Sequence, residues 1–131
     1  TSHDLAPRRR ESELPMALDA AHHRLFVGTR QPPSLLAYDT ETGSVVATLP
    51  IARDVDDLFY DAKRQQIYAI CGEGVVNVIK QIDINQYANI GEVKTASGGR
   101  TGLFVAERNA LYVAIPARGA SAAEVRVYTV R

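Results

Sequence analysis

Short apolar runs alternate with short polar stretches along the chain, and this pattern occurs three times. In each copy an apolar run is followed by about five mostly polar residues and then by a second apolar run, which opens with Leu25-Phe26, Ile67-Tyr68 or Leu111-Tyr112. These dipeptides recur with a period of roughly 42–44 residues. The runs are too short for helices and the intervening stretch has the length of a turn, so each copy is predicted to contain a β-hairpin.

A third strand is predicted after each hairpin, and a fourth strand in the first two copies. In the first copy Asp39-Thr40-Glu41-Thr42-Gly43 is predicted to form a tight hairpin turn before the fourth strand. An Asp side chain can bond its own backbone and Gly can take the positive φ that such a turn needs. In the second copy Asp83-Ile84-Asn85-Gln86 plays the same part with a longer loop. The expected strands are 16–19, 25–28, 34–38 and 44–49, then 58–61, 67–70, 75–79 and 87–93, and finally 103–105, 111–114 and 125–130.

A repeat of this length built only from strands is typical of β-propeller blades. The predicted fold class is therefore all-β, with blades of four-stranded antiparallel sheets and about three blades in this chain, that is, a partial propeller. Residues 14–131 form the three-blade unit, with blades at about 14–52, 53–97 and 98–131. Residues 1–13 are an N-terminal segment and a candidate outer strand of a closing blade.

Several segments resemble the bacterial YVTN-type β-propeller repeat, in which "RLYV" and "VIDTxTGxVVATI" sequences alternate. They are Leu111-Tyr112-Val113-Ala114, Leu36 to Gly43, and Ile67-Tyr68. The resemblance covers about residues 14–131 and implies a WD-repeat-like propeller, a scaffold used for many purposes. The second copy departs from it at Asp83-Ile84-Asn85, where the Asp-Thr-x-Thr-Gly turn is missing. Relatives of this kind leave a periplasmic or secreted location open.

Three blades do not close the usual ring of roughly four to eight. The flanks of the first and third blades would expose apolar faces, so either the chain is the C-terminal part of a longer propeller or several copies associate. In the second case residues 1–13 could pair with Val125 to Val130 of a neighbouring copy. Phe26, Tyr68 and Tyr112 are expected to be equivalent, either lying between blades or covering a sheet face.

The charges of the chain balance, with 15 basic and 15 acidic side chains. No global field therefore attracts nucleic acid or an anionic membrane. The positive charge of Arg8-Arg9-Arg10 is partly offset by the nearby Glu11 and Glu13, which favours a solvated segment over a phosphate-binding arm. No run approaches the ~18 apolar residues of a membrane span and no signal peptide is recognisable, so a soluble chain in an undefined compartment is expected.

Candidate ligand-binding residues gather where one blade passes to the next. The first crossing contains Arg53, Asp54, Asp56 and Asp57, and the second contains Arg100 and Thr101. A third crossing is a candidate at Arg8 to Glu13. In a propeller such connections approach the central channel, so these side chains would share a rim, suited either to mutual ion pairing or to a polar ligand. A purely structural role is the alternative, in which Asp57 bonds backbone amides and Gly98-Gly99 permits a turn.

Residues with catalytic or metal-binding chemistry are scarce. Cys71 is the only cysteine and is expected to be buried, while His22 and His23 are expected in an exposed turn. Asp54 to Asp57 lacks the Gly and distal Glu of a calcium loop, and Gly98 to Gly102 lacks the Lys-Ser/Thr ending of a phosphate loop. No catalytic residue, metal or cofactor is therefore predicted.

The function predicted from the sequence is a non-enzymatic binding or scaffold module that presents a polar face or channel rim to a protein or small ligand. The alternative is an enzyme with its active site in the channel, of the lactonase-like or quinoprotein-like propeller type. That alternative depends on convergence of Asp54, Asp56 and Asp57, the only carboxylate cluster available.

Overall fold

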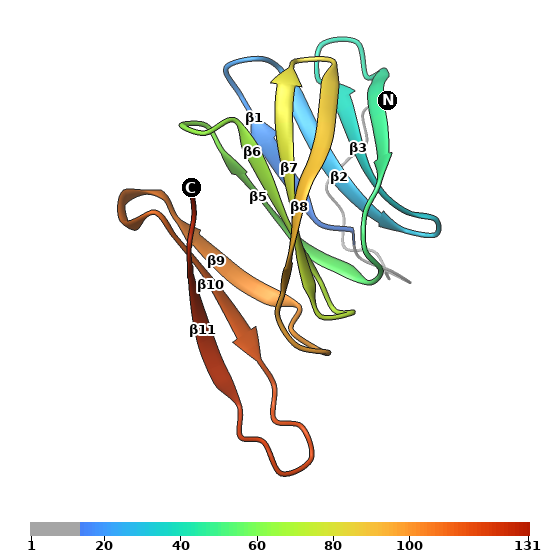
Figure 1. Ribbon diagram of the computed structural model, residues 1–131. Helices are drawn as coiled ribbons and strands as arrows, with labels where there is room; N and C mark the ends of the chain where they lie inside the picture. The colour runs from blue at the N-terminus through green and yellow to red at the C-terminus, as the bar shows by residue number, and fades with distance from the viewer. Residues whose placement is uncertain (1–13) are drawn as a thin grey trace, which may run out of the picture.

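The computed structural model describes residues 14–131, which fold into three antiparallel sheets lying side by side (Figure 1). Blade 1 contains β1 (Met16–Asp19), β2 (Arg24–Arg30), β3 (Pro33–Asp39) and β4 (Val45–Pro50). Blade 2 contains β5 (Val55–Asp61), β6 (Gln66–Cys71), β7 (Val75–Asp83) and β8 (Gln86–Lys94). Blade 3 contains β9 (Thr101–Val105), the 3-10 turn η1 (Ala106–Arg108), β10 (Ala110–Ile115) and β11 (Glu124–Thr129). The predicted all-β partial propeller is confirmed, whereas residues 1–13 and the crossing at Arg8 to Glu13 lie outside the described residues.

The turn between the first and second strands is built in the same way in every blade. Its last residue is left-handed, at φ 56° for His23, 54° for Gln65 and 51° for Asn109. The carbonyl of that residue then accepts a backbone N–H from the third-strand side of the blade, with N···O distances of 3.0, 2.8 and 2.8 Å from Thr40, Gln81 and Val130 respectively. These shared hydrogen bonds set residue-by-residue equivalences between the blades.

Two details differ from the sequence-based expectation. The second fourth-strand loop is shorter than predicted, because β7 continues to Asp83 and only Ile84 and Asn85 separate it from β8. The Asp83 carboxylate accepts the Asn85 N–H at 2.7 Å, and this hydrogen bond stabilises the short turn between β7 and β8. In addition, β5 begins at Val55, since Val55 pairs with Cys71 across a bulge, so part of the first crossing is strand.

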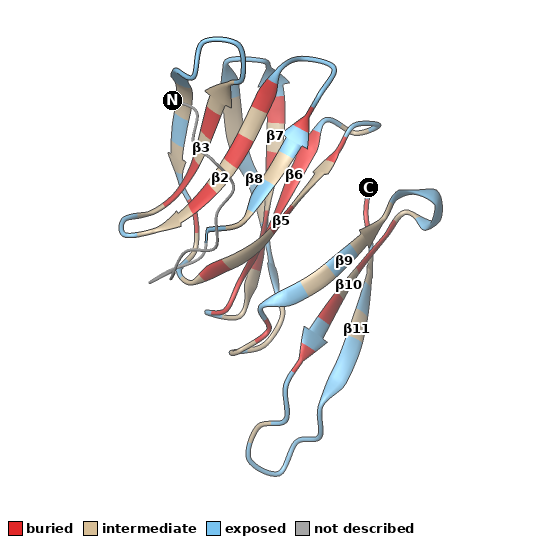
Figure 2. Cartoon of the chain, turned by 180° about the vertical axis from the view of Figure 1, so that it is seen from behind, coloured by how far each residue is buried: buried red, intermediate tan, exposed pale blue. Residues whose placement is uncertain are grey.

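Apolar side chains between neighbouring blades form the core, and the buried residues lie mainly on the middle strands (Figure 2). Phe26 of blade 1 is fully buried between two tyrosines of blade 2, with ring centroids 5.5 Å from Tyr60 and 5.5 Å from Tyr87. Tyr68 of blade 2 meets Phe104 of blade 3 edge-on at 5.3 Å. Two of the three equivalent aromatics therefore lie between blades, as one of the predicted alternatives proposed.

The third equivalent aromatic, Tyr112, lies on the open face of blade 3. It pairs across the sheet with Leu103 and Val127, whose side chains are 58% and 59% exposed. The open face of blade 1 is also apolar, with Met16 and Leu18 exposed. The two flanks thus expose apolar surface that resembles the surface buried between the blades.

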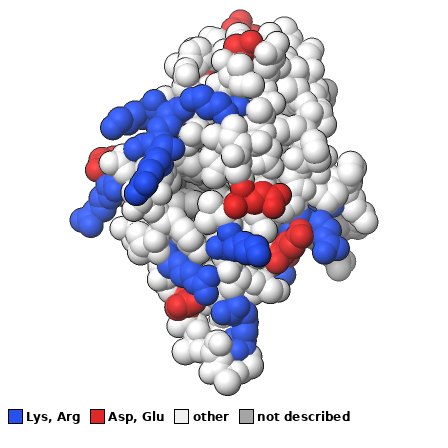
Figure 3. Space-filling model, viewed as in Figure 1, with Lys and Arg blue, Asp and Glu red and all other residues white. Residues whose placement is uncertain are grey.

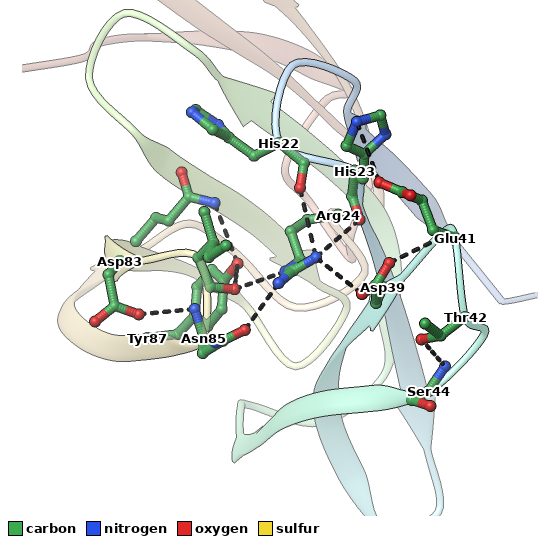
Figure 4. A network of polar contacts seen from close by, with 12 residues as sticks. His22, His23, Arg24, Asp39, Glu41, Thr42, Ser44, Asp83, Asn85 and Tyr87 are labelled. Carbon is green, nitrogen blue, oxygen red and sulfur yellow. Dashed lines mark hydrogen bonds and ion pairs between the residues drawn. The ribbon is translucent and has the colours of Figure 1, made fainter.

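Buried polar side chains tie blade 1 to blade 2. The Arg24 guanidinium donates to the Ile84 carbonyl at 2.8 Å and to Asn85 Oδ1 at 2.9 Å, across the boundary between the blades (Figure 4). Asp19 lies beside this group. Burial alone would raise the pKa of Asp19, but hydrogen bonds from Gln81 and His22 outweigh burial and lower it.

A similar polar group lies between blades 2 and 3. The carboxylate of Asp61 accepts the Tyr68 hydroxyl at 2.7 Å and pairs with Arg64 at 3.1 Å. Arg64 in turn donates to Asn109 Oδ1 of blade 3 at 2.8 Å. Both boundaries therefore combine an apolar interior with a buried charged anchor. Within residues 14–131 there is no helix with the length and apolarity needed to cross a membrane.

Candidate functional site: a charged rim across the blades

Four charged side chains from different parts of the repeat meet at one end of the blades. Arg100 contacts Asp54 Oδ2 through Nη2 at 2.8 Å and Nε at 2.9 Å. Arg30 approaches Asp54 Oδ1 at 3.7 Å and donates to Asp56 Oδ1 at 2.5 Å. Arg30 ends β2, the two aspartates lie at the passage from blade 1 to blade 2, and Arg100 precedes β9. We call Arg30, Asp54, Asp56 and Arg100 the charged rim.

The backbone around Asp54 is specialised for this contact. Asp54 has φ 64°, a left-handed conformation that aspartate tolerates better than most residues. Its carbonyl accepts the Gly72 N–H at 2.7 Å, which brings the β6–β7 turn close to its side chain. A Cβ atom on Gly72 would collide with the Asp54 carboxylate and press on the Arg100 guanidinium. The absence of a side chain at Gly72 is therefore what allows the Asp54–Arg100 pair to form.

Asp57 is separate from the rim pairs and has the structural role considered in the sequence analysis. Its carboxylate accepts the backbone N–H of Gly102 at 3.2 Å, which links β5 to β9. Burial raises the pKa of Asp57, the Gly102 amide opposes this shift, and the neighbouring Asp56 adds to it. Because β5 and β9 start early, Asp56, Asp57 and Thr101 belong to strands, which corrects their placement in the crossings.

Arg53 and Thr101 occupy the edges of the same end of the molecule. Arg53 belongs to a different pair: its backbone N–H donates to Glu73 Oε2 at 2.9 Å and its guanidinium lies 3.6 Å from the same carboxylate. Thr101 is exposed and lines an open depression of about 710 Å³. The depression is bounded by Asp56, Gly98, Arg100, Thr101, Ala114, Ile115, Pro116, Ala123, Glu124 and Val125.

The structure therefore brings together Asp54, Asp56 and Arg100 of the six predicted residues and adds Arg30, which the sequence analysis missed. Arg30 lies at the end of β2, two residues beyond the predicted strand, before a turn that contains Pro32. Arg30 is far from Asp54 and Asp56 in the sequence, so no local motif indicates that they pair. Only the pairing of β2 with β3, and the packing of blade 1 on blade 2, brings it to them.

The chemistry available at the rim is ion pairing and hydrogen bonding. Asp54 and Asp56 bind arginines and Asp57 binds a backbone amide, so each of the three carboxylates already has a partner. Within residues 14–131 no three His, Cys, Asp or Glu side chains are grouped closely enough to hold a metal ion.

The remaining reactive side chains lie elsewhere, as predicted. Cys71 is fully buried, and burial raises the pKa of its thiol to about 12, so it stays protonated at neutral pH. His22 and His23 are exposed in the β1–β2 turn, where His22 lies beside Asp19. His23 lies beside Glu41 (Figure 4).

Comparison with known proteins supports the fold. No family model matches the chain, and no curated protein matches it in sequence. Hydrazine synthase of Kuenenia stuttgartiensis is similar in structure, with a TM-score of 0.74 at 13% identity over 88% of this chain and 33% of that chain. Sqt1 of Saccharomyces cerevisiae gives a TM-score of 0.65 at 18% identity, over 98% of this chain and 34% of that chain. The WD40 domain of Neurospora crassa Pan2 gives 0.61 at 18% identity, over 92% and 37%.

These likenesses concern the fold alone, because the identities are low. The chain spans about a third of the length of the structures that it matches. Residues 14–131 thus have a WD40-like β-propeller fold with three blades.

Proposed function

We propose that this chain is a non-enzymatic protein-binding or scaffold module that presents its charged rim to a protein or small polar ligand. The observation that carries the proposal is the rim itself, in which residues of several blades converge at one end of the molecule. Its similarity to WD40 propellers supports a binding role, and the repeats resemble the bacterial YVTN type within that class. Completion by further blades, from a longer polypeptide or from other copies, belongs to the same proposal.

The rim is suited to binding because its arginines are only partly used. The Arg100 side chain is 50% exposed and directs two of its nitrogens to a single carboxylate oxygen. A guanidinium has five N–H donors, so donors remain for an incoming carboxylate or carbonyl. The adjoining depression places the exposed hydroxyl of Thr101 and the edge of blade 3 beside them. A partner with an acidic or carbonyl-rich loop could contact both the Arg100 guanidinium and the Thr101 hydroxyl.

A capture experiment with paired variants tests this proposal. The intact chain is immobilised and exposed to lysate of its source, with cross-linking and mass spectrometry to identify bound proteins. Arg100→Ala and Thr101→Ala are expected to lose a partner that the wild type binds. Lys63→Ala removes an exposed residue from the β5–β6 turn, at the other end of blade 2, and should retain that partner.

The melting temperature of each variant shows whether it is folded. Asp54 keeps Arg30 as a neighbour when Arg100 is removed, so Arg100→Ala should fold. Partners that bind the wild type, Arg100→Ala and Thr101→Ala equally would contradict a binding role for the rim and the adjoining depression.

A further inference from the structure

A cavity of about 380 Å³ lies between blades 1 and 2, at the end of the molecule that carries the charged rim. Its walls come from the end of β4, the connection from β4 to β5, the β6–β7 turn and the outer strand β8. Blades 1 and 2 each have four strands within the described residues, so two complete sheets form this cavity. Pockets for small molecules begin at about 300 Å³, so a small ligand fits its size.

Asn77 of β7 borders the cavity and has an unused hydrogen-bond donor. Its side chain is fully buried, and Oδ1 accepts the backbone N–H of the lining residue Ala52 at 2.7 Å. A backbone N–H can only donate, so this contact fixes the orientation of the side-chain amide. The other amide atom, Nδ2, has no hydrogen-bond partner among residues 14–131. A buried donor without a partner is unfavourable, so Asn77 favours an occupant that supplies an acceptor.

A carboxylate lies next to Asn77 on the same face of blade 2. Glu92 of β8 is the cross-strand partner of Asn77, lines the cavity and is exposed. The other lining carboxylate, Glu73, lies 3.6 Å from the Arg53 guanidinium, whereas Glu92 has no ion-pair partner in the part of the chain that the structure describes. Figure 3 shows acidic and basic side chains side by side at the lower end of the molecule. No strong field of one sign therefore covers this end, and Glu92 is available to a cationic group.

The spacing of Asn77 and Glu92 indicates the class of ligand. Directly opposed residues of an antiparallel pair have Cβ atoms about 4.5–5.5 Å apart. A donor and a carboxylate are thus within reach of one small molecule that carries an acceptor and a cation close together. An α-amino acid has this arrangement, because its carboxylate and its ammonium are bonded to the same carbon. Pro50, Ile51 and Val75 also line the cavity and provide an apolar surface for an aliphatic side chain.

We propose that the cavity between blades 1 and 2 binds a free α-amino acid with an aliphatic side chain. The ammonium of the ligand pairs with Glu92, and its carboxylate enters the inner end of the cavity and accepts a hydrogen bond from Asn77 Nδ2. The Arg53 side chain lines the cavity and is 78% exposed, and its charge adds to the attraction for the carboxylate. This binding site goes beyond the proposed protein-binding role and uses none of the four residues of the charged rim.

L-leucine and two of its analogues test the class of ligand. Each is titrated into the isotope-labelled intact chain, and binding is followed by NMR from the amide chemical shifts. L-leucine should shift the signals of Ala52, Val75 and Glu92 but not that of Val113 in blade 3. Isocaproate lacks the ammonium and isopentylamine lacks the carboxylate, so each should bind at least tenfold more weakly. The absence of shifts at about 10 mM leucine, where even a millimolar Kd is detected, would overturn the inference.

Variants of the protein locate the binding. Glu92→Gln removes a charge from an exposed position and should weaken leucine binding at least tenfold, whereas Glu107→Gln makes the same change at an exposed position of η1 and should not. Asn77→Asp keeps an acceptor for the Ala52 N–H but replaces the donor by a second oxygen. It should weaken leucine binding at least tenfold without weakening the binding of isopentylamine, a difference that misfolding does not produce. Melting temperatures verify folding, and leucine binding that survives Glu92→Gln would refute the site.

Two further measurements separate this site from other modes of binding. Arg100→Ala should leave the affinity for leucine unchanged, so the outcome is independent of the test of the rim. A tripeptide with N-terminal leucine keeps the ammonium but has an amide in place of the carboxylate, and it should bind more weakly than leucine. Equal or tighter binding of the tripeptide would identify the N-terminus of a polypeptide as the ligand and overturn the assignment to a free amino acid.

Discussion

Replacing Tyr68 by alanine should destabilise the protein more than the same change at Tyr112, although the two residues are equivalent in the repeat. Tyr68 is 2% exposed and contacts the next blade, whereas Tyr112 is half-buried on the open face of blade 3. Residue type and strand position are matched, so the two changes differ in blade packing and in the hydrogen bonds of the Tyr68 hydroxyl to Asp61 and Gln66.

Three losses contribute to the cost at Tyr68. Removing a buried aromatic side chain leaves a cavity and costs about 3–5 kcal/mol in protein cores. Part of this is the edge-on contact with Phe104, since such pairs are worth about 0.5–1.5 kcal/mol. The buried Asp61 carboxylate also loses the hydroxyl donor at 2.7 Å, although Arg64 remains bound to it. We therefore expect a loss of about 3–5 kcal/mol for Tyr68→Ala.

Tyr68→Phe separates the hydroxyl from the ring. Burial raises the pKa of Tyr68 far above its usual value, and the hydrogen bond to Asp61 adds to the shift, so the hydroxyl stays protonated and keeps donating. Loss of one hydrogen bond to a buried charge should cost about 1–3 kcal/mol. Tyr112→Ala should cost about 1 kcal/mol or less, as for other partly exposed sites.

Urea unfolding followed by circular dichroism gives these free energies, with light scattering to verify that all variants have the same mass. An unchanged melting temperature for Tyr68→Ala, or an equal loss for Tyr112→Ala in a monomeric sample, would refute the interpretation that blade packing buries this position.

Further predictions concern the rim and the buried charges. Gly72→Ala should lower stability by no more than about 1 kcal/mol, because its methyl group displaces only the side-chain ends of the exposed Asp54–Arg100 pair, and thermal unfolding measures this. Since burial raises the pKa of Asp57 above its unfolded value, ionised Asp57 opposes folding and stability falls as pH rises through that interval. Asp57→Asn should therefore gain stability relative to the wild type at pH 7 but not at pH 3, in paired melts. Arg24→Met should cost about 2–4 kcal/mol in urea unfolding, because buried hydrogen-bond acceptors lose their donor.

Most of the fold could be predicted from the sequence because the repeat is visible in local patterns. The dipeptides Leu25-Phe26, Ile67-Tyr68 and Leu111-Tyr112 place one residue on each face of the second strand, and the structure has strands at all three. The turn at Asp39 to Gly43 was also predictable: Gly43 has φ 76° and the Asp39 carboxylate accepts the Glu41 N–H at 2.8 Å. Such features depend on neighbours in sequence, which is why they can be read directly.

The candidate site was predictable only in part, because its contacts join blades. Arg53 and Arg100 both lie in connections between blades, yet Arg53 pairs with Glu73 while Arg100 pairs with Asp54. The Asp54–Arg100 contact depends in addition on Gly72, which lies in neither crossing. Arg30 was missed for the same reason. Which carboxylate an arginine meets is decided by the packing of one sheet on another.

Departures from the repeat are as informative as its regularities. Asp19 and Asp61 end the first strands of blades 1 and 2 and anchor buried polar groups, whereas Val105 occupies this position in blade 3. Tyr128 of β11 matches Tyr38 of blade 1, and only blade 2 has an aliphatic residue, Ile79, at this position. Blade 3 thus lacks a counterpart of the polar anchors that Asp19 and Asp61 form in the other two blades. The anchors belong to the two boundaries between described blades, because Asp19 accepts a hydrogen bond from Gln81 of blade 2 and the Arg64 that pairs with Asp61 donates to Asn109 of blade 3.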